Sequence, residues 1–110
     1  MLPAAYRLKI PTSWGKSNPD FQIKTEYFKV IGKKVASIKT AKIGFIISGK
    51  VGKATVRNRI RRKISGLLQS NLQKLNSNKE LIWVVYPSIN QASNEEISTA
   101  VSKVLSKLDF

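Results

Sequence analysis

The chain has 110 residues, of which 42 % are hydrophobic and 24 % are charged, so one small globular domain is expected and intrinsic disorder is not. It contains no cysteine and no histidine, which excludes disulfides, thiol nucleophiles, zinc sites built from either residue and histidine-dependent triads. Twenty Lys and Arg residues against six Asp and Glu residues give a net charge of +14, which predicts a polyanionic partner.

The positive charge is concentrated in the first part of the chain. Residues 1–63 contain sixteen Lys or Arg and two acidic residues, whereas residues 64–110 contain four of each sign. The longest apolar runs, residues 43–47 and 81–86, are too short to cross a bilayer, and no signal-peptide hydrophobic segment follows the first residues. We therefore expect a cytoplasmic protein with no membrane partner, whose binding surface precedes residue 64.

The first half of the chain predicts an arm, a hairpin and a strand. Three prolines and a glycine interrupt residues 1–20, which predicts an extended or looped arm. Residues 21–31 and 34–39 are rich in aromatic and β-branched side chains, and the Gly32-Lys33 pair between them predicts the turn of a hairpin. Residues 43–47 form a continuous apolar run, as expected of a strand buried on both faces.

The second half predicts a helix, a strand and another helix. Apolar residues recur at spacings of three and four from Val56 to Leu75, which predicts a helix with one stripe facing a core. Residues 81–86, closed by Pro87, predict a second buried strand, so residues 43–86 form a strand-helix-strand unit. Ser93 and Glu96 form a capping box before a second amphipathic helix. The fold class is therefore α+β, a mixed sheet with helices packed on it.

The start of the first predicted helix has an unfavourable arrangement of charge. Five cations follow one another there without an interleaved acid: Arg57, Arg59, Arg61, Arg62 and Lys63. Each exposed cation at a helix N-terminus opposes the helix dipole by about 0.3–1 kcal/mol, and like charges four residues apart repel. The planar fork of arginine suits phosphate. We interpret this segment as a surface for a polyphosphate, the alternative being an ordinary solvated helix face.

Aromatic residues accompany the basic residues of the first third of the chain. Trp14, Phe21, Tyr27 and Phe28 are candidates for stacking on unpaired bases, with ordinary core or strand packing as the alternative for each. The six acidic residues are scattered, so no catalytic residue and no metal ligand is predicted. A DNA-binding helix-turn-helix is disfavoured because the basic helix follows a strand.

Residues 44–62 resemble the signature of the bacterial ribonuclease P protein subunit. The matching residues are Gly44-Phe45-x-x-Ser48-x-Lys50-Val51-Gly52-Lys53-Ala54-x-Val56-Arg57-Asn58-Arg59-Ile60-Arg61-Arg62. The apolar strand ending at Pro87 and the capped last helix also resemble that family. So does the opening Leu2-Pro3 followed by Arg7-Leu8.

The resemblance implies a fold and a function. The fold is a single domain over residues 1–110, with a four-stranded mixed sheet, two to three helices and a left-handed strand-helix-strand crossover, similar to domain four of elongation factor G. The function is that of the non-catalytic subunit of a ribonucleoprotein endoribonuclease. An RNA subunit, which holds most of the Mg²⁺, removes the 5′ leader of precursor tRNA. The implied partners are ribonuclease P RNA and precursor tRNA, with no DNA.

The resemblance also implies site residues. The RNA-binding set is Lys50, Lys53, Arg57, Asn58, Arg59, Arg61, Arg62 and Lys63. Phe21, Tyr27 and Phe28 would contact the 5′ leader. The chain departs from the family at Gly49 and Ser65, where basic residues are usual, and its N-terminal segment does not show the family's N-terminal helix. The alternative function is a ribosomal or other structural RNA-binding protein, which would share the charge and the fold without stimulating tRNA processing.

Overall fold

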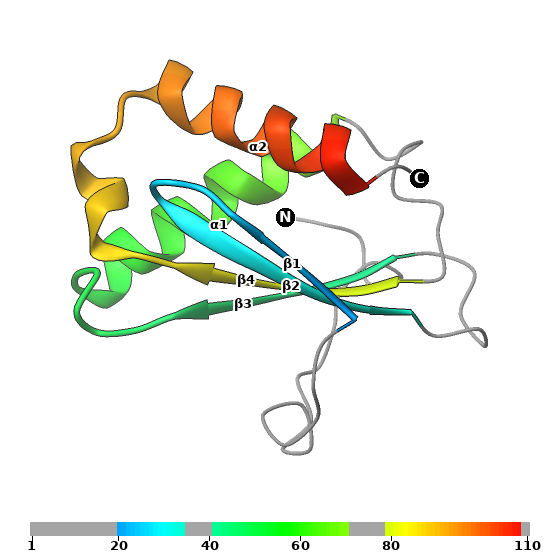
Figure 1. Ribbon diagram of the computed structural model, residues 1–110. Helices are drawn as coiled ribbons and strands as arrows, with labels where there is room; N and C mark the ends of the chain where they lie inside the picture. The colour runs from blue at the N-terminus through cyan, green and yellow to red at the C-terminus, as the bar shows by residue number, and fades with distance from the viewer. Residues whose placement is uncertain (1–19, 35–40, 71–78, 109–110) are drawn as a thin grey trace.

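The structure, a computed structural model, describes residues 20–34, 41–70 and 79–108. Figure 1 shows its elements in chain order: β1 (Phe21–Lys24), β2 (Phe28–Lys34), β3 (Lys42–Ile47), α1 (Ala54–Gln69), β4 (Lys79–Val85), the 3-10 helix η4 (Pro87–Gln91) and α2 (Asn94–Leu108). The strands form one sheet in the order β1-β2-β4-β3. The arm expected over residues 1–20 lies, except for Asp20, outside the described residues.

The central strand β4 gives the sheet its mixed character. It pairs antiparallel with β2 and parallel with β3. A parallel pair requires a crossover connection, and α1 supplies it. The predicted strand-helix-strand unit is thereby confirmed, as is the α+β class of a mixed four-stranded sheet with helices.

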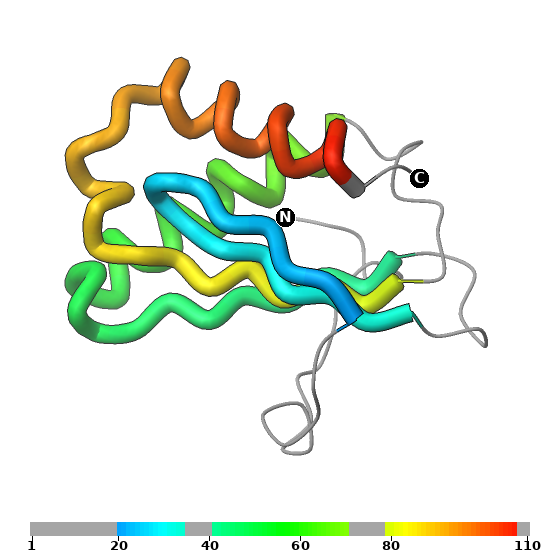
Figure 2. Tube along the Cα trace, in the orientation of Figure 1, coloured from blue at the N-terminus to red at the C-terminus, as the bar shows by residue number. Residues whose placement is uncertain are grey.

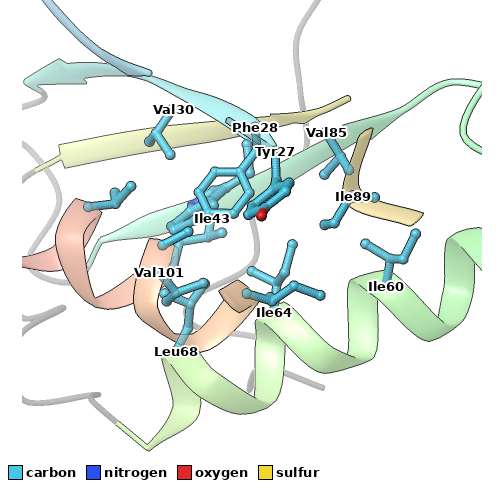
Figure 3. Packing of buried hydrophobic residues seen from close by; sticks show 14 of the residues in the cluster. Tyr27, Phe28, Val30, Ile43, Ile60, Ile64, Leu68, Val85, Ile89 and Val101 are labelled. Carbon is cyan, nitrogen blue, oxygen red and sulfur yellow. The ribbon is translucent and has the colours of Figure 1, made fainter. Parts of the chain in front are cut away.

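One face of the sheet forms the core with both helices. The register places Phe28 of β2 beside Val85 of β4 and Val30 beside Trp83, all of them on this face. The rings of Phe28 and Trp83 are tilted at 51° with centroids 5.0 Å apart, a contact that adds about 0.5–1.5 kcal/mol to the area they bury. Figure 3 shows the side chains that the two helices contribute to this core, among them Ile60, Ile64, Leu68 and Val101.

Strand β3 lies at the edge of the sheet, and one of its faces is partly open to solvent. The prediction that it is buried on both faces is therefore wrong. Ile43 and Ile47 lie in the core, whereas Ile46 points to the other face and is 43 % exposed. The run of apolar residues therefore serves two surfaces, one packed and one accessible. An unbroken apolar run does not by itself distinguish these two environments.

The hairpin turn lies between β1 and β2 at residues 25–27, so the prediction of a turn at Gly32-Lys33 is also wrong. The Thr25 hydroxyl accepts hydrogen bonds from the backbone N–H of Tyr27 at 3.3 Å and of Phe28 at 3.2 Å. A threonine hydroxyl thus closes a turn that contains no glycine. Gly32 and Lys33 lie inside β2, and residues 35–40 fall outside the described residues.

Gly32 is required within β2 because the ring of Phe21 occupies the space where a side chain would lie. The two residues are paired across β1 and β2. A Cβ atom on Gly32 would lie 2.1 Å from Cζ of Phe21. This glycine therefore serves packing between strands rather than a turn.

Both predicted helices form. Ile60, Ile64 and Leu68 of α1 are buried as expected, while Leu72 and Leu75 lie outside the described residues. The capping box is confirmed: the Glu96 N–H donates to Oγ of Ser93 at 3.1 Å, and the Ser93 N–H donates to Oε1 of Glu96 at 3.0 Å. No helix in the described ranges has the length and apolar character needed to span a membrane.

The packing of Phe21 on Gly32 yields a first prediction. Gly32→Ala should lower the free energy of unfolding by about 1–3 kcal/mol, because the new methyl group must displace an aromatic ring. Urea denaturation measures the change. Gly49→Ala is the matched control, since a Cβ atom at Gly49 meets nothing within 4 Å. Equal stability of the two variants would contradict the argument, whereas a smaller loss in a Phe21→Ala background would support it.

Candidate nucleic-acid interface

The loop between β3 and α1 holds two exposed lysines on an anchored backbone. Val51 is 2 % exposed, its N–H donates to the carbonyl of Ser48 at 3.1 Å, and its own carbonyl accepts a hydrogen bond from the Asn90 side chain of η4. Figure 2 shows that this loop and η4 lie at the same end of the molecule. Lys50 and Lys53 on either side of Val51 are exposed. The loop therefore presents two cations from a fixed position.

Gly52 sets the path from this loop into α1. Its φ is +156°, which side-chain-bearing residues rarely adopt, and a Cβ atom there would lie 3.0 Å from Cβ of Val56. Gly49 has open space around it and is exposed. Of the two glycines in the loop, Gly52 is the one that the backbone requires.

The first turn of α1 has neither a side-chain cap nor an acidic residue. Lys53 occupies the N-cap position with an extended backbone and makes no side-chain capping hydrogen bond. The free N–H groups and the positive end of the helix dipole therefore add to the charge of the arginines that follow. This end of α1 is a region of positive potential that favours an anion.

The arginines of α1 fall into two groups. Nε of Arg57 donates to the carbonyl of Gly52 at 3.1 Å, and Nη1 of Arg61 donates to Oδ1 of Asn58 at 2.9 Å, so both are tethered. Arg59 and Arg62 are exposed, and neither forms a hydrogen bond or an ion pair within the described residues. Their guanidinium groups are available for a bidentate contact with phosphate.

The sequence-predicted RNA-binding residues all have access to solvent. The exposed ones are Lys50, Lys53, Asn58, Arg59 and Arg62, and the half-buried ones are Arg57, Arg61 and Lys63. They form one continuous segment from the loop through the first three turns of α1. We call this segment, residues 50–63, the basic segment.

Two of the three predicted leader-binding aromatics do not share this accessibility. Phe28 is 0 % exposed and lies against Trp83, so it offers no ring face to a base. Tyr27 is 9 % exposed, and its hydroxyl donates to Oε2 of Glu96 at 2.7 Å. The structure thus does not support leader stacking on Phe28 or Tyr27 and places both in the core cluster. Phe21 is half-buried, and its role stays a prediction.

The opposite face of the sheet carries a row of residues that the sequence analysis did not predict as a site. The strand register aligns Lys24, Lys29, Val84 and Ile46 across β1, β2, β4 and β3. Lys29, Val84 and Ile46 face away from the helices, because the adjacent row, from Phe28 through Val85 to Ile47, lies in the core. Lys24, at the end of edge strand β1, also borders the hollow between the β1–β2 turn and α2. Period-two alternation in β2 was the available signal, since Lys29 lies between Phe28 and Val30. We call Lys24, Lys29, Val84 and Ile46 the open-face row.

The hydrogen bond between Tyr27 and Glu96 ties the β1–β2 turn to the start of α2. It is the main reason that the pKa of Tyr27 is raised to about 12, with burial adding to the effect. The same bond, followed by the hydrogen bonds from Ser93, lowers the pKa of the Glu96 carboxyl group below its ordinary value. These shifts identify a structural contact, which explains why Tyr27 is not free to bind a nucleotide.

The pKa shift of Glu96 predicts the pH dependence of stability. Because its folded-state pKa lies below the unfolded value of about 4.3, the contribution of the bond is present above that pH and is lost as pH falls through the folded-state pKa. Tyr27→Phe should therefore lower the Tm at pH 7, and the difference from wild type should shrink as Glu96 becomes protonated at acidic pH. Thermal unfolding monitored by circular dichroism tests this. Tyr86→Phe is the control, because it removes no hydrogen bond to an acid within the described residues, and its difference in Tm from wild type should not depend on pH. A pH-independent difference in Tm for Tyr27→Phe would refute the assignment.

The sequence profile of the Ribonuclease P family matches residues 2–109. The chain belongs to the ribonuclease P protein family. It is 31 % identical over 69 residues to the ribonuclease P protein component of Alkaliphilus oremlandii, covering 63 % of this chain and 60 % of that protein. It is 23 % identical over 100 residues to the same component of Alkaliphilus metalliredigens, covering 84 % of this chain and 90 % of that protein.

Solved structures agree with this assignment at the level of the fold. A ribonuclease P protein of Staphylococcus aureus, a mutant with defective mRNA degradation activity, superposes with a TM-score of 0.83 at 21 % identity and covers 94 % of this chain and 88 % of that one. The ribonuclease P protein of Thermotoga maritima gives a TM-score of 0.77 at 18 % identity, with coverages of 92 % and 96 %. The predicted ribonuclease P protein-like fold is thus confirmed.

Proposed function

We propose that this chain is the protein subunit of a cytoplasmic ribonuclease P, which binds the catalytic RNA and precursor tRNA and assists Mg²⁺-dependent removal of the 5′ leader. Membership of the family supports the proposal. The observation that carries it is the pair of guanidinium groups of Arg59 and Arg62, at the acid-free start of α1, which form no hydrogen bond or ion pair with any other residue that the structure describes. Local stability alone would not select this arrangement, and a phosphate backbone offsets its cost.

The basic segment assists by neutralising charge. A catalytic RNA and its RNA substrate repel each other, and diffuse Mg²⁺ normally screens that repulsion. Fixed cations at the loop and on α1 replace part of this screening and release counterions on binding. The protein is therefore expected to matter most at low Mg²⁺ concentration, where ionic screening is weakest.

We propose that RNA, rather than this protein, holds the Mg²⁺ of the reaction. This ion takes oxygen ligands, usually one or two carboxylates together with phosphates and water. In the three described ranges no group of three or more His, Cys, Asp or Glu residues is placed to hold a metal. Glu96 is engaged by Tyr27 and Ser93. Membership of the family supports assigning both the Mg²⁺ of the reaction and the catalytic role to the RNA subunit.

Cleavage of a precursor tRNA by a bacterial ribonuclease P RNA at low Mg²⁺ tests the proposal. The wild-type protein should accelerate 5′ maturation, and an Arg59→Ala, Arg62→Ala variant should lose most of the acceleration. Its affinity for the RNA should also depend less on salt, with a log–log slope smaller by about two, one for each cation removed. Arg57 is left unchanged because it is tethered to Gly52.

The matched control removes the same charge elsewhere. Lys103→Ala together with Lys107→Ala deletes two exposed cations of α2 and should retain the acceleration. If both double variants lose it equally, net charge rather than the basic segment is responsible. If the wild type binds RNA tightly but does not accelerate cleavage by cognate RNA, the alternative of a structural RNA-binding protein is correct. If the protein cleaves without RNA, the non-catalytic assignment is wrong.

For the 5′ leader we propose the open-face row in place of Tyr27 and Phe28. It combines lysines from β1 and β2 with the exposed side chain of Ile46 on β3. A single-stranded RNA needs cations for its phosphates and accessible apolar surface for its bases. The row supplies both on one sheet face.

Lys24→Ala with Lys29→Ala should therefore abolish the preference of the assembled enzyme for precursor tRNA over mature tRNA. The reason is that only the precursor carries the leader that the row would contact. Equilibrium binding of the two tRNAs measures the preference, and the Lys103→Ala, Lys107→Ala variant is again the control. A preference that survives in the Lys24, Lys29 variant would contradict this placement of the leader.

A further inference from the structure

A pocket of about 340 Å³ lies beside the basic segment, between α1, η4 and the start of α2. Its apolar walls are four buried isoleucines, Ile60, Ile64, Ile89 and Ile97. Figure 3 shows Ile60 and Ile64 projecting from α1 toward the sheet, with Ile89 of η4 nearby. The volume is at the lower end of the roughly 300–1,000 Å³ of ligand pockets, which suits one flat ring system.

The polar residues of this pocket are cationic or neutral. Arg59 and Lys63 of α1 line it together with Asn90 and Asn94, and no acidic residue does. A second pocket, between the β1–β2 turn and α2, differs in this respect because Glu26, Glu95 and Glu96 line it. Charge complementarity therefore assigns an anionic ligand to the pocket beside α1.

The Asn90 side chain is held in a defined orientation. Its Nδ2 donates a hydrogen bond to the carbonyl oxygen of Val51. A carbonyl oxygen can only accept a hydrogen bond, so the amide nitrogen of Asn90 must face Val51. Oδ1 of Asn90 remains as an acceptor. Asn94, at the first residue of α2, is exposed and carries both an acceptor and a donor. An asparagine amide can pair with the edge of a nucleobase, as it does with adenine in the major groove of DNA.

We propose that this pocket receives one unpaired nucleobase of the bound RNA. The base would lie against half-buried Ala92 and the outer edges of Ile60 and Ile97, its edge would face Asn90 and Asn94, and its flanking phosphates would contact Arg59 and Lys63. The pocket shares these two cations with the basic segment, so an RNA bound there places its nucleotides next to the opening. The inference rests on the proposed RNA-binding function and adds to it a site that recognises a base rather than the backbone.

Two RNA hairpins of identical stem sequence, one with a single bulged adenosine and one fully paired, test the proposal. The wild-type protein should bind the bulged hairpin at least about tenfold more tightly, the effect of one well-placed base contact. Ala92→Phe fills the pocket without changing charge and should abolish this preference while leaving binding of the paired hairpin intact. Gln91→Phe adds the same ring at the exposed neighbouring residue, which does not line the pocket, and should keep the preference.

A second measurement does not depend on a variant that must fold. In protein with ¹³C-labelled isoleucine methyl groups, the bulged hairpin should shift the resonances of Ile60, Ile89 and Ile97 beyond the shifts caused by the paired hairpin. Ile23 of β1, which does not line this pocket, is the internal reference. Equal affinity for both hairpins together with unchanged isoleucine signals would overturn the pocket assignment but leave RNA binding intact. Failure to bind either hairpin or the ribonuclease P RNA would instead overturn the proposed function.

Discussion

The parallel pairing of β3 with β4 is the constraint on which the rest of this structure depends. Two neighbouring parallel strands begin at the same end of the sheet. After β3 the chain must therefore run back over the length of the strand before β4 can start. Helix α1 makes this return. As a result, the loop after Ile47, the first turn of α1 and η4 after Val85 all gather at the edge where both strands end.

Packing of α1 against the core explains why its electrostatically unfavourable start persists. Isolated helices are marginal, and most helical stability in proteins comes from packing of the apolar face. In α1 the buried residues begin at Ile60, about two turns beyond the uncapped Lys53, and continue to Leu68. The core therefore holds the helix from its middle, and its packing does not depend on the charges of the first turn. The tie from Asn90 to Val51 fixes the loop that precedes it.

The sequence predicted the structure correctly where a short pattern of residues is compatible with only one kind of element. The Ser93–Glu96 capping box and the three-and-four spacing of Ile60, Ile64 and Leu68 specified helices without knowledge of their neighbours. It failed where the outcome depends on a partner strand. Gly32 has the appearance of a turn residue until its cross-strand neighbour is known, and Thr25 closes a turn through its hydroxyl. The burial of Phe28 follows from alternation, whereas the pocket beside α1 joins residues up to 38 positions apart in sequence, between Arg59 and Ile97, which no local pattern reveals.

The charged, uncapped start of α1 has a consequence for the thermodynamics of the free protein. Any polyanion that binds the folded chain and not the unfolded one raises its apparent stability by RT ln(1 + [L]/Kd), which is about 2.7 kcal/mol at a ligand concentration of 100 Kd. Net stabilities of small domains are about 5–15 kcal/mol, so this increment is a substantial fraction of the whole. When such a ligand is bound, part of the free energy that maintains the folded state comes from this association. The melting temperature of the chain should for that reason depend on the concentration of polyanions in the solution as well as on its own sequence.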